Sequence, residues 1–396
     1  MANIKDVVFV GAARTAIGTF GGALKDTPAC ELGGNVVKEA FKRANVDPAQ
    51  AGQIVFGNVI HCESRDMYVS RVVGINAGMS RDSSALTLNR LCGSGLQAII
   101  TAANAIQMGD TEVAVGGGVE TMSRAPYSML TARWGVRMGD TKMIDMLTGS
   151  LSDPFGAGHM GVTAENVAEK FGITREQQDA FALESQRRAT EAIAAGRFKE
   201  QIVPIEIATR KGTISFDTDE HPKTGLTLES LGKLRPAFKK EGGTVTAGNS
   251  SGINDGAAAC IVMEAEAAAR AGLRPLARLV SYAVAGVEPA IMGTGPIPAV
   301  QMALKRAGLR LDDMDVIESN EAFAAQSLGV CRGLDLAPER TNPNGGAIAL
   351  GHPLGASGAI LTVKCLYELI RTEKRYGLIT MCIGGGQGIA AVIERV

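Results

Sequence analysis

The sequence predicts an α/β protein made of two duplicated halves, with a separate segment inserted into the first half. Near-continuous apolar runs, such as VVFV at 7–10 and LITMCI at 378–383, alternate with amphipathic helical patterns, which is typical of sheets buried on both faces. A long internal repeat relates the two ends of the chain. The 396 residues, 45% hydrophobic and 20% charged, suffice for about two or three domains.

The repeat unit begins with a helix, a turn and a short strand. VVKEAFKRANVDPAQAGQIVFGNV at 36–59 parallels AVQMALKRAGLRLDDMDVIESNEA at 299–322, and the two strands end in Asn58 and Asn320. Both copies continue with a Gly/Ser turn that opens an apolar helix, at 93–106 in the first and 355–369 in the second. A strand that runs into glycines follows, at 112–118 and at 378–386. Two copies of one βα-rich half are therefore expected.

An insertion distinguishes the first copy from the second. The second copy closes with GIAAVIERV at 388–396, whereas its match in the first, GAAACIVME at 256–264, follows a long intervening segment. This segment holds Trp134 and a capping box from Thr174 to Gln177, which predicts a helix that ends near Gly196. We expect a first half of residues 1–118 and 248–270, an inserted helical, loop-rich lid of residues 119–247, and a second half of residues 271–396.

Charge and cysteine usage exclude several classes of protein. With 40 basic and 41 acidic residues, the chain lacks the positive charge of a nucleic-acid binder, and no apolar run reaches the ~18 residues of a membrane span. The strand-like run VVFVG at 7–11 leaves no room for a signal peptide, so a cytoplasmic location is expected. Seven cysteines at irregular spacing, without CxxC pairs, fit neither a disulfide framework nor a zinc knuckle.

Cys92 is the first candidate catalytic residue. It stands in NRLCGSGLQAI, between the strand-like SALTL and a helix that begins at about Ser94. A thiol at a helix N-terminus faces free backbone N–H groups, which lower its pKa toward the thiolate. The alternative is a small buried hydrophobic residue, which is the usual environment of a free cysteine.

His352 and Cys382 stand in glycine-rich loops near the C-terminus. His352 lies in NPNGGAIALGHPLGASG, a rigid turn before a helix, where it is either an acid or base or a structural residue. Cys382 precedes GGGQG at 384–388, where backbone N–H groups could form an oxyanion site, or it is a buried strand residue. A dinucleotide fingerprint fails here because only eight residues follow Gly388.

Four further residues are candidates for the same site. Asn320, in ESNEAFAAQ, falls where an apolar strand gives way to a helix, so that its amide is either a helix N-cap or an active-site hydrogen-bonding group. His159 and Met160 in GAGHMGVTAEN and Met292 in AIMGTGP could line an acyl pocket, although methionines are more often core filler.

Eight motifs in order carry a family resemblance. They are NRLCGSGLQAI, GGGVETMSRAPY, HMGVTAENVA, KLRPAF, TAGNSSGINDGAA, NEAFAAQ, NPNGGAIALGHPLGASG and CIGGGQG. Together they resemble the thiolases, specifically the bacterial acetyl-CoA acetyltransferase and β-ketothiolase branch, over essentially the whole chain. The resemblance implies a five-layered αβαβα thiolase fold with an inserted loop domain that serves CoA binding and tetramerisation, and a homotetramer.

The resemblance also implies a role for each site residue. Cys92 is the acyl-accepting nucleophile, His352 the base that deprotonates it, and Cys382 the group that moves the proton at the α-carbon of the second acetyl-CoA. Asn320 holds a water that forms one oxyanion hole with His352, and the N–H groups of Cys92 and Gly384 form the other. This chemistry calls for neither a metal nor a redox cofactor, and coenzyme A is a substrate or product.

The implied reaction interconverts two acetyl-CoA with acetoacetyl-CoA and CoA. The family pattern places the pantetheine arm near Ser251 and the nucleotide on the loop domain, where Lys223 replaces a usual arginine. Lysine lacks the planar fork of guanidinium, so weaker nucleotide binding is expected. The loop ESRDMY at 63–68 resembles β-ketothiolases that accept longer 3-ketoacyl-CoA, from C4 to C8.

Two other functions are weighed against this one. A decarboxylating β-ketoacyl synthase shares the fold and a nucleophilic cysteine, but such synthases generally have no second cysteine in the glycine loop where this chain has Cys382. A non-catalytic acyl-CoA-binding protein does not need the full set of Cys92, Asn320, His352 and Cys382.

Overall fold

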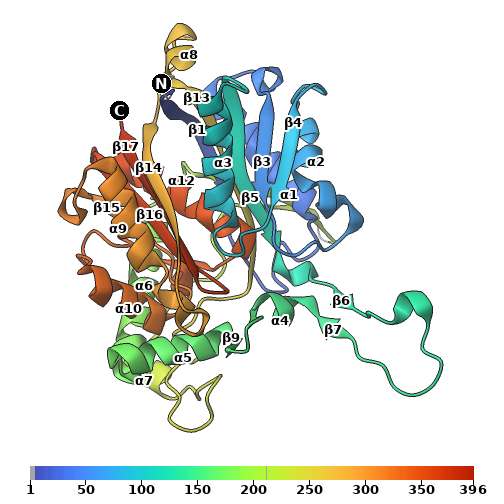
Figure 1. Ribbon diagram of the computed structural model, residues 1–396, viewed down its shortest axis with the longest axis vertical. Helices are drawn as coiled ribbons and strands as arrows, with labels where there is room; N and C mark the ends of the chain where they lie inside the picture. Colours follow the sequence, from blue (N-terminus) through green and yellow to red (C-terminus); the bar gives the residue numbers. More distant parts are fainter. Residues whose placement is uncertain (1–4, 211) are drawn as a thin grey trace.

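The computed structural model describes residues 5–210 and 212–396, and a large mixed sheet runs through its centre (Figure 1). Its strand order is β15-β16-β17-β14-β1-β13-β5-β3-β4, with the short strands β10 and β2 paired to β1 and β13. The strands are β1 Val7–Thr15, β2 Gly18–Thr19, β3 Gln53–Gly57, β4 Ser84–Leu88, β5 Val113–Thr121, β10 Ile202–Val203, β13 Asn254–Glu264, β14 Ala277–Gly286, β15 Val316–Ser319, β16 Tyr376–Ile383 and β17 Gln387–Arg395.

The sheet consists of two related halves. In the first, β3 pairs parallel to β5, and β5 pairs antiparallel to β13; in the second, β15, β16 and β17 repeat this pattern. The halves meet where β1 pairs with β14, at Val8↔Arg278 and Phe9↔Ala277. The predicted repeat is therefore present in the structure: each copy runs from a helix to a strand that ends just before Asn58 or Asn320.

Helices form three layers around the two halves of the sheet. Helices α3 (Ser94–Met108) and α12 (Leu354–Thr372) pack against each other between the halves, whereas α1 (Ala29–Ala44) and α2 (Val69–Asn76) cover the first half and α9 (Pro296–Ala307) and α10 (Ala324–Leu334) lie against the second. Helices α3 and α12 cross at two glycines. A Cβ on Gly95 would lie 2.7 Å from the Ala359 nitrogen, and one on Gly358 would lie 2.3 Å from the Leu96 nitrogen, so only glycine permits this approach.

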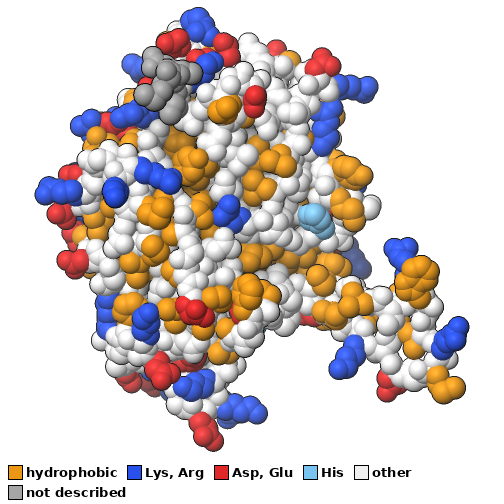
Figure 2. Space-filling view, viewed as in Figure 1, with side chains coloured by type: hydrophobic (Ala, Val, Ile, Leu, Met, Phe, Trp, Pro, Cys, Tyr) orange, Lys and Arg blue, Asp and Glu red, His pale blue; other side chains and the backbone are white. Residues whose placement is uncertain are grey.

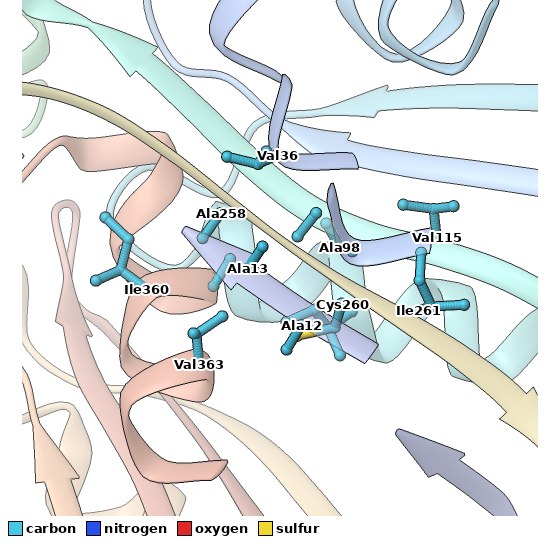
Figure 3. Packing of buried hydrophobic residues seen from close by; sticks show 14 of the residues in the cluster. Ala12, Ala13, Val36, Ala98, Val115, Ala258, Cys260, Ile261, Ile360 and Val363 are labelled. Atoms are coloured by element: carbon cyan, nitrogen blue, oxygen red, sulfur yellow. The ribbon is translucent and has the colours of Figure 1, made fainter. Parts of the chain in front are cut away.

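The core between these layers is made largely of small side chains. Figure 3 shows Ala12 and Ala13 of β1, Ala98 of α3, and Ala258 and Cys260 of β13 close together, all fully buried. Small side chains let the strands and helices approach closely and fill the interior at high density. The two central helices are therefore held firmly, and two of the candidate catalytic residues, Cys92 and His352, lie just before their N-termini.

The inserted segment is helical and rich in loops, as predicted. It contains α4 (Met146–Ser150), α5 (Met160–Phe171), α6 (Arg175–Ala194), α7 (Leu228–Gly232) and the hairpins β6/β7 (Tyr127–Ser128, Ile144–Asp145), β8/β9 (Ser152–Asp153, Gly158–His159) and β11/β12 (Ile205–Thr209, Gly212–Phe216). Thr174 and Gln177 form the expected capping box at the start of α6, and Gly196 follows the helix with a φ of +69°. The remaining short helices are α8 (Ala265–Arg270) and α11 (Ala347–Leu350). In the described part of the chain, no helix is both long and apolar enough to cross a membrane.

Candidate active site

Cys92 lies on a tight turn between β4 and α3. Leu91, just before it, has a φ of +45°, which a bulky side chain adopts only at a cost of about 1–3 kcal/mol. Ser94 holds the turn, because its hydroxyl donates to the Leu91 carbonyl at 2.7 Å and accepts from the Arg90 N–H at 2.8 Å. The turn leaves Cys92 partly exposed just before the first residue of α3, where the sequence places it.

The protonation state of Cys92 differs from the expectation. Burial raises the pKa of its thiol to about 11, although the backbone N–H groups of Gly384 and of Cys92 itself lower it. Loss of hydration outweighs the effect of the N–H groups, so the helix N-terminus alone does not make the resting thiol a thiolate. Cys92 is a neutral thiol at neutral pH, and it needs a base before it can act as a nucleophile.

His352 has the properties of that base. Its side chain is 4% exposed, and burial lowers the pKa of the imidazole to about 4, so the ring is neutral. The Ser357 hydroxyl donates to the Pro353 carbonyl at 2.9 Å and lies 2.6 Å from Nδ1 of His352. Since the hydroxyl proton is engaged, the oxygen accepts from Nδ1–H, and Nε2 is left as the nitrogen with a free lone pair.

Asn320 reaches the same imidazole from the other side. Its backbone N–H donates to the Thr380 carbonyl at 2.9 Å, and its Nδ2 lies 3.4 Å from Nε2 of His352. The N-cap alternative is wrong, because α10 begins at Ala324 and Phe323 is its N-cap. The amide therefore belongs to the site and faces the free lone pair of the base.

Cys382 lies within β16, fully buried and paired with Gly388 of β17. Burial raises the pKa of its thiol well above the ordinary value, and the nearby thiol of Cys92 raises it further. A negative charge on one of the two sulfurs thus opposes a charge on the other. The two thiols are suited to ionise in turn rather than together.

Apolar side chains from the insertion and the second half surround this centre. Met160 and Met292 pack with Cys382 and Phe323 in one buried cluster, so the structure brings both predicted methionines to Cys382. His159 has a structural function: its Nδ1 accepts from the Gly161 N–H at 3.0 Å and caps α5. Its ring also stacks on Phe238, with 4.7 Å between the centroids.

The two predicted CoA-binding residues lie in different places. Ser251 is next to the centre, since its N–H donates to the Ala322 carbonyl at 3.0 Å, and Ala322 belongs to the same apolar cluster. Lys223 lies outside that cluster, in an open groove of about 450 Å³ along α6, where its N–H donates to Oε1 of Gln186 at 2.9 Å.

Two supporting residues were not identified from the sequence. Ser357 fixes the ring of His352, and Oδ1 of Asn254 accepts the His352 backbone N–H at 2.9 Å. Ser357 could have been found, because it stands five residues after His352 in the first turns of a predicted helix. Asn254 is 98 residues away along the chain, so no local signal marks it.

Two neighbouring thiols, with a neutral imidazole that is linked through Asn320 to the strand of Cys382, define an acyltransferase that uses cysteine chemistry. The comparisons with known proteins identify its family. The model of the thiolase N-terminal domain matches residues 7–266, and that of the thiolase C-terminal domain matches residues 273–395. The chain belongs to the thiolase family, and the predicted thiolase fold is confirmed.

Individual relatives match over the full length. The chain is 60% identical over 392 residues to beta-ketothiolase BktB of Cupriavidus necator, covering 99% of this chain and 100% of that protein. It is 52% identical to an acetyl-CoA acetyltransferase of Syntrophomonas wolfei, covering 98% and 99%. The crystal structure of human mitochondrial 3-ketoacyl-CoA thiolase in complex with CoA superposes with a TM-score of 0.96 at 46% identity, covering 100% of this chain and 99% of that one.

Proposed function

We propose that this protein is an acetyl-CoA C-acetyltransferase, a β-ketothiolase that interconverts two acetyl-CoA with acetoacetyl-CoA and CoA. The observation that carries the proposal is the closeness of two thiols, Cys92 and Cys382, together with a neutral imidazole, His352, that contacts Asn320 next to the strand of Cys382. A condensation of thioesters needs a covalent acyl carrier, a base for a weakly acidic C–H bond and donors for oxyanions. The names of the full-length relatives support the same reaction.

In the first half-reaction, Nε2 of His352 takes the proton of the Cys92 thiol. The thiolate attacks the carbonyl carbon of acetyl-CoA, and the N–H groups of Cys92 and Gly384, which face the sulfur, are placed to stabilise the oxyanion. His352 then returns the proton to the departing CoA thiolate. The acetyl group is left on Cys92, and the imidazole is neutral again.

In the second half-reaction, Cys382 is the group that removes the α-proton of the second acetyl-CoA. It must first give up its own proton, because burial keeps it a neutral thiol, and His352 accepts this proton. The enolate attacks the acetyl group, while Asn320, through a water shared with His352, stabilises the charge on the enolate oxygen. Cys92 leaves as a thiolate and takes the proton back from His352. The α-proton remains on Cys382, so the cycle balances.

CoA is bound as substrate and product, and the two thiols and the imidazole supply the chemistry. In this proposal Ser251, beside the apolar cluster, contacts the pantetheine arm, and Lys223 on the inserted segment contacts the nucleotide. The similarity to a thiolase structure in complex with CoA supports CoA thioesters as the ligand class. The inserted segment of residues 119–247 then serves as a lid and as a binding surface.

We propose a homotetramer, as the family resemblance implies, and an exposed apolar arm supports contacts between copies of the chain. The β6/β7 hairpin extends away from the body of the molecule, and its tip carries apolar side chains (Figures 1 and 2). Trp134 and Met138 are 87% and 94% exposed, which is unfavourable in water unless another copy covers them. Sedimentation equilibrium tests this assembly, which has a mass of about four chains of 41.2 kDa.

A wider substrate range is the second candidate function. A cavity of about 640 Å³ opens beside Leu91 and is walled by Val59, Ile60, Tyr127 and Met146. Such a space can take apolar chains longer than acetoacetyl. Thiolysis rates with 3-ketoacyl-CoA from C4 to C8 decide the range: a steep fall after C4 supports the narrow function, and a flat profile supports the wide one.

The proposed function is tested by labelling. Wild-type protein given radiolabelled acetyl-CoA and quenched should carry the label on the peptide that contains Cys92. Cys92→Ser should lose nearly all turnover, because a serine hydroxyl cannot ionise comparably at that site. Retention of more than about a tenth of the activity contradicts the assignment, since loss of a covalent step costs orders of magnitude. Label on another cysteine contradicts it as well.

A further inference from the structure

Glu120 is a buried carboxyl group that the proposed reaction does not use. It lies near the end of β5, with no exposed surface. Its Oε1 accepts from the Ile60 N–H at 3.0 Å and from Nδ2 of Asn58 at 3.2 Å, and its Oε2 accepts from the Val59 N–H at 3.0 Å and the Gly355 N–H at 2.7 Å. Every one of these partners is a donor.

This arrangement is built for a carboxylate anion. Four donors occupy the lone pairs of the two oxygens, so a proton on Glu120 would have to displace one of them. The Gly355 N–H belongs to the first turn of α12, where the helix dipole also favours a negative charge. Burial opposes ionisation and raises the pKa of Glu120 to about 7, while the N–H groups of Ile60, Gly355 and Val59 lower it.

Glu120 occupies the position in the first half that Cys382 occupies in the second. Gly118 of β5 lies opposite the last residue of β3, and Thr380 of β16 lies opposite the last residue of β15. Two residues further along each strand come Glu120 and Cys382. The duplicated fold has therefore placed a carboxylate and a reactive thiol at equivalent positions.

The partner of Glu120 has an equivalent as well. Helices α3 and α12 cross at Gly95 and Gly358, and the residues three positions before these glycines are Cys92 and Gly355. The contact between Glu120 and the Gly355 N–H is thus the counterpart of the approach of Cys382 to Cys92. The duplicated fold thus brings a strand end and a helix N-terminus together in two places. In one place they carry the two thiols, Cys382 and Cys92, and in the other they carry the Glu120 carboxylate and the Gly355 N–H.

This contact affects both partners of the proposed acyl transfer. Gly355 lies between His352 and Ser357, so a carboxylate that holds its N–H also holds the turn that carries the base. The charge of Glu120 also reaches Cys92 and disfavours ionisation of its thiol. Asp66 is a further acidic group close to Glu120.

We propose that Glu120 is a positioning residue for acyl transfer: its carboxylate ties the segment 58–60 to the N-terminus of α12 and so sets His352 in place to serve Cys92. The inference rests on the proposed function, since it assumes that Cys92 accepts the acyl group. It predicts that the rate of acetylation depends on Glu120, although Glu120 does not contact the acyl group.

Glu120→Gln is the main test, because it keeps the size of the side chain but sets an NH₂ group among N–H donors. Acetylation of Cys92 by labelled acetyl-CoA should slow by about 100-fold, the usual effect of a displacement near 1 Å, at an unchanged half-saturating concentration. Alkylation of Cys92 by iodoacetamide at pH 8, followed on its peptide, should become about three- to tenfold faster, because a nearby negative charge is gone. Local unfolding would also expose Cys92 to alkylation, so the unfolding midpoint of the variant in denaturant has to match that of the wild type.

Two further variants complete the experiment. Glu368→Gln removes a buried carboxylate on α12 itself, one bonded to Asn344 and Arg371 near the other end of the helix, and should leave both rates near wild type. Gly355→Ala places a Cβ 2.7 Å from Oε2 of Glu120 and so disturbs the same contact from the side of α12. This variant tests the proposal if Glu120→Gln folds poorly. It should slow acetylation without slowing alkylation.

The inference is overturned if Glu120→Gln is acetylated within about threefold of the wild-type rate, well short of the expected effect. A fall in acetylation without faster alkylation also overturns it. Failure of the proposed function is a separate result, seen when wild-type Cys92 itself takes up no label.

Discussion

Nδ2 of Asn320 lies 3.4 Å from Nε2 of His352, so an amide at the end of β15 faces the free lone pair of the imidazole before α12. The other ring nitrogen is occupied by Ser357 at 2.6 Å. The side of the ring that can accept a proton is therefore directed toward the position of Asn320. This relationship supports His352 as the base of the proposed reaction.

Loss of the Ser357 hydroxyl should weaken the base. In Ser357→Ala, Nδ1–H has no acceptor, so the ring orientation and tautomer are no longer fixed, and kcat should fall by about 10–100-fold with little change in KM. Thr362→Ala is the matched control, because Thr362 makes the same kind of bond on the same helix, to the Gly358 carbonyl at 2.8 Å, without contact to His352. Equal effects of the two substitutions would contradict the role of Ser357.

The pH dependence of acylation should reflect the buried imidazole. Burial lowers the pKa of His352 from 6.5 to about 4, so the base stays neutral as the pH falls through the ordinary range. The amount of acyl-enzyme formed in a rapid-quench burst should hold to about pH 5 and then decline. A half-loss near pH 6.5 would mean that the imidazole is hydrated like a free one.

The same shift affects the stability of the fold. Because the pKa of His352 is lower in the folded protein than in the unfolded chain, the unfolded chain binds the proton first. Stability from this group is complete above about pH 6.5 and is lost as the pH falls toward 4.

A buried ion pair behind the site should matter for stability. Nζ of Lys364 lies 2.6 Å from Oε2 of Glu318 and donates to the Gly345 carbonyl at 2.8 Å, and both charged side chains are buried. Lys364→Met leaves the carboxylate without its cation and should cost about 3–5 kcal/mol of the free energy of unfolding. The double variant Lys364→Met with Glu318→Leu should recover most of this loss. Denaturant unfolding measures both, and a double variant no more stable than Lys364→Met would contradict the assigned pairing.

The sequence predicts much of the fold because the repeat and the capping signals are local. The strand before Asn320, the helix after Cys92 and the box at Thr174 depend on residues a few positions apart, and each is present in the structure. The neutral state of Cys92 could not be predicted from its helix N-terminus. Its pKa is decided by how much protein covers the thiol, which only the packing of both halves determines.

The supporting contacts show the same limit. Glu120 reaches Gly355 across 235 residues, through the register of β3 against β5 and the crossing of α3 with α12. A sequence pattern can indicate that a strand ends in a glutamate, but it cannot show which N–H groups surround that glutamate. The family resemblance supplies the roles of the reactive residues, and the structure supplies the residues that hold them.

The most direct test of the whole account is a paired measurement on Cys382→Ser. Quenched-flow labelling reports acetylation of Cys92, and exchange of solvent deuterium into the methyl group of acetyl-CoA reports removal of the α-proton. If Cys92 carries the acyl group and Cys382 only moves the α-proton, the variant should still be acetylated while exchange and carbon–carbon bond formation are lost. Equal loss of acetylation and exchange would show that Cys382 takes part in the first half-reaction, and the division of roles between the two thiols would be wrong.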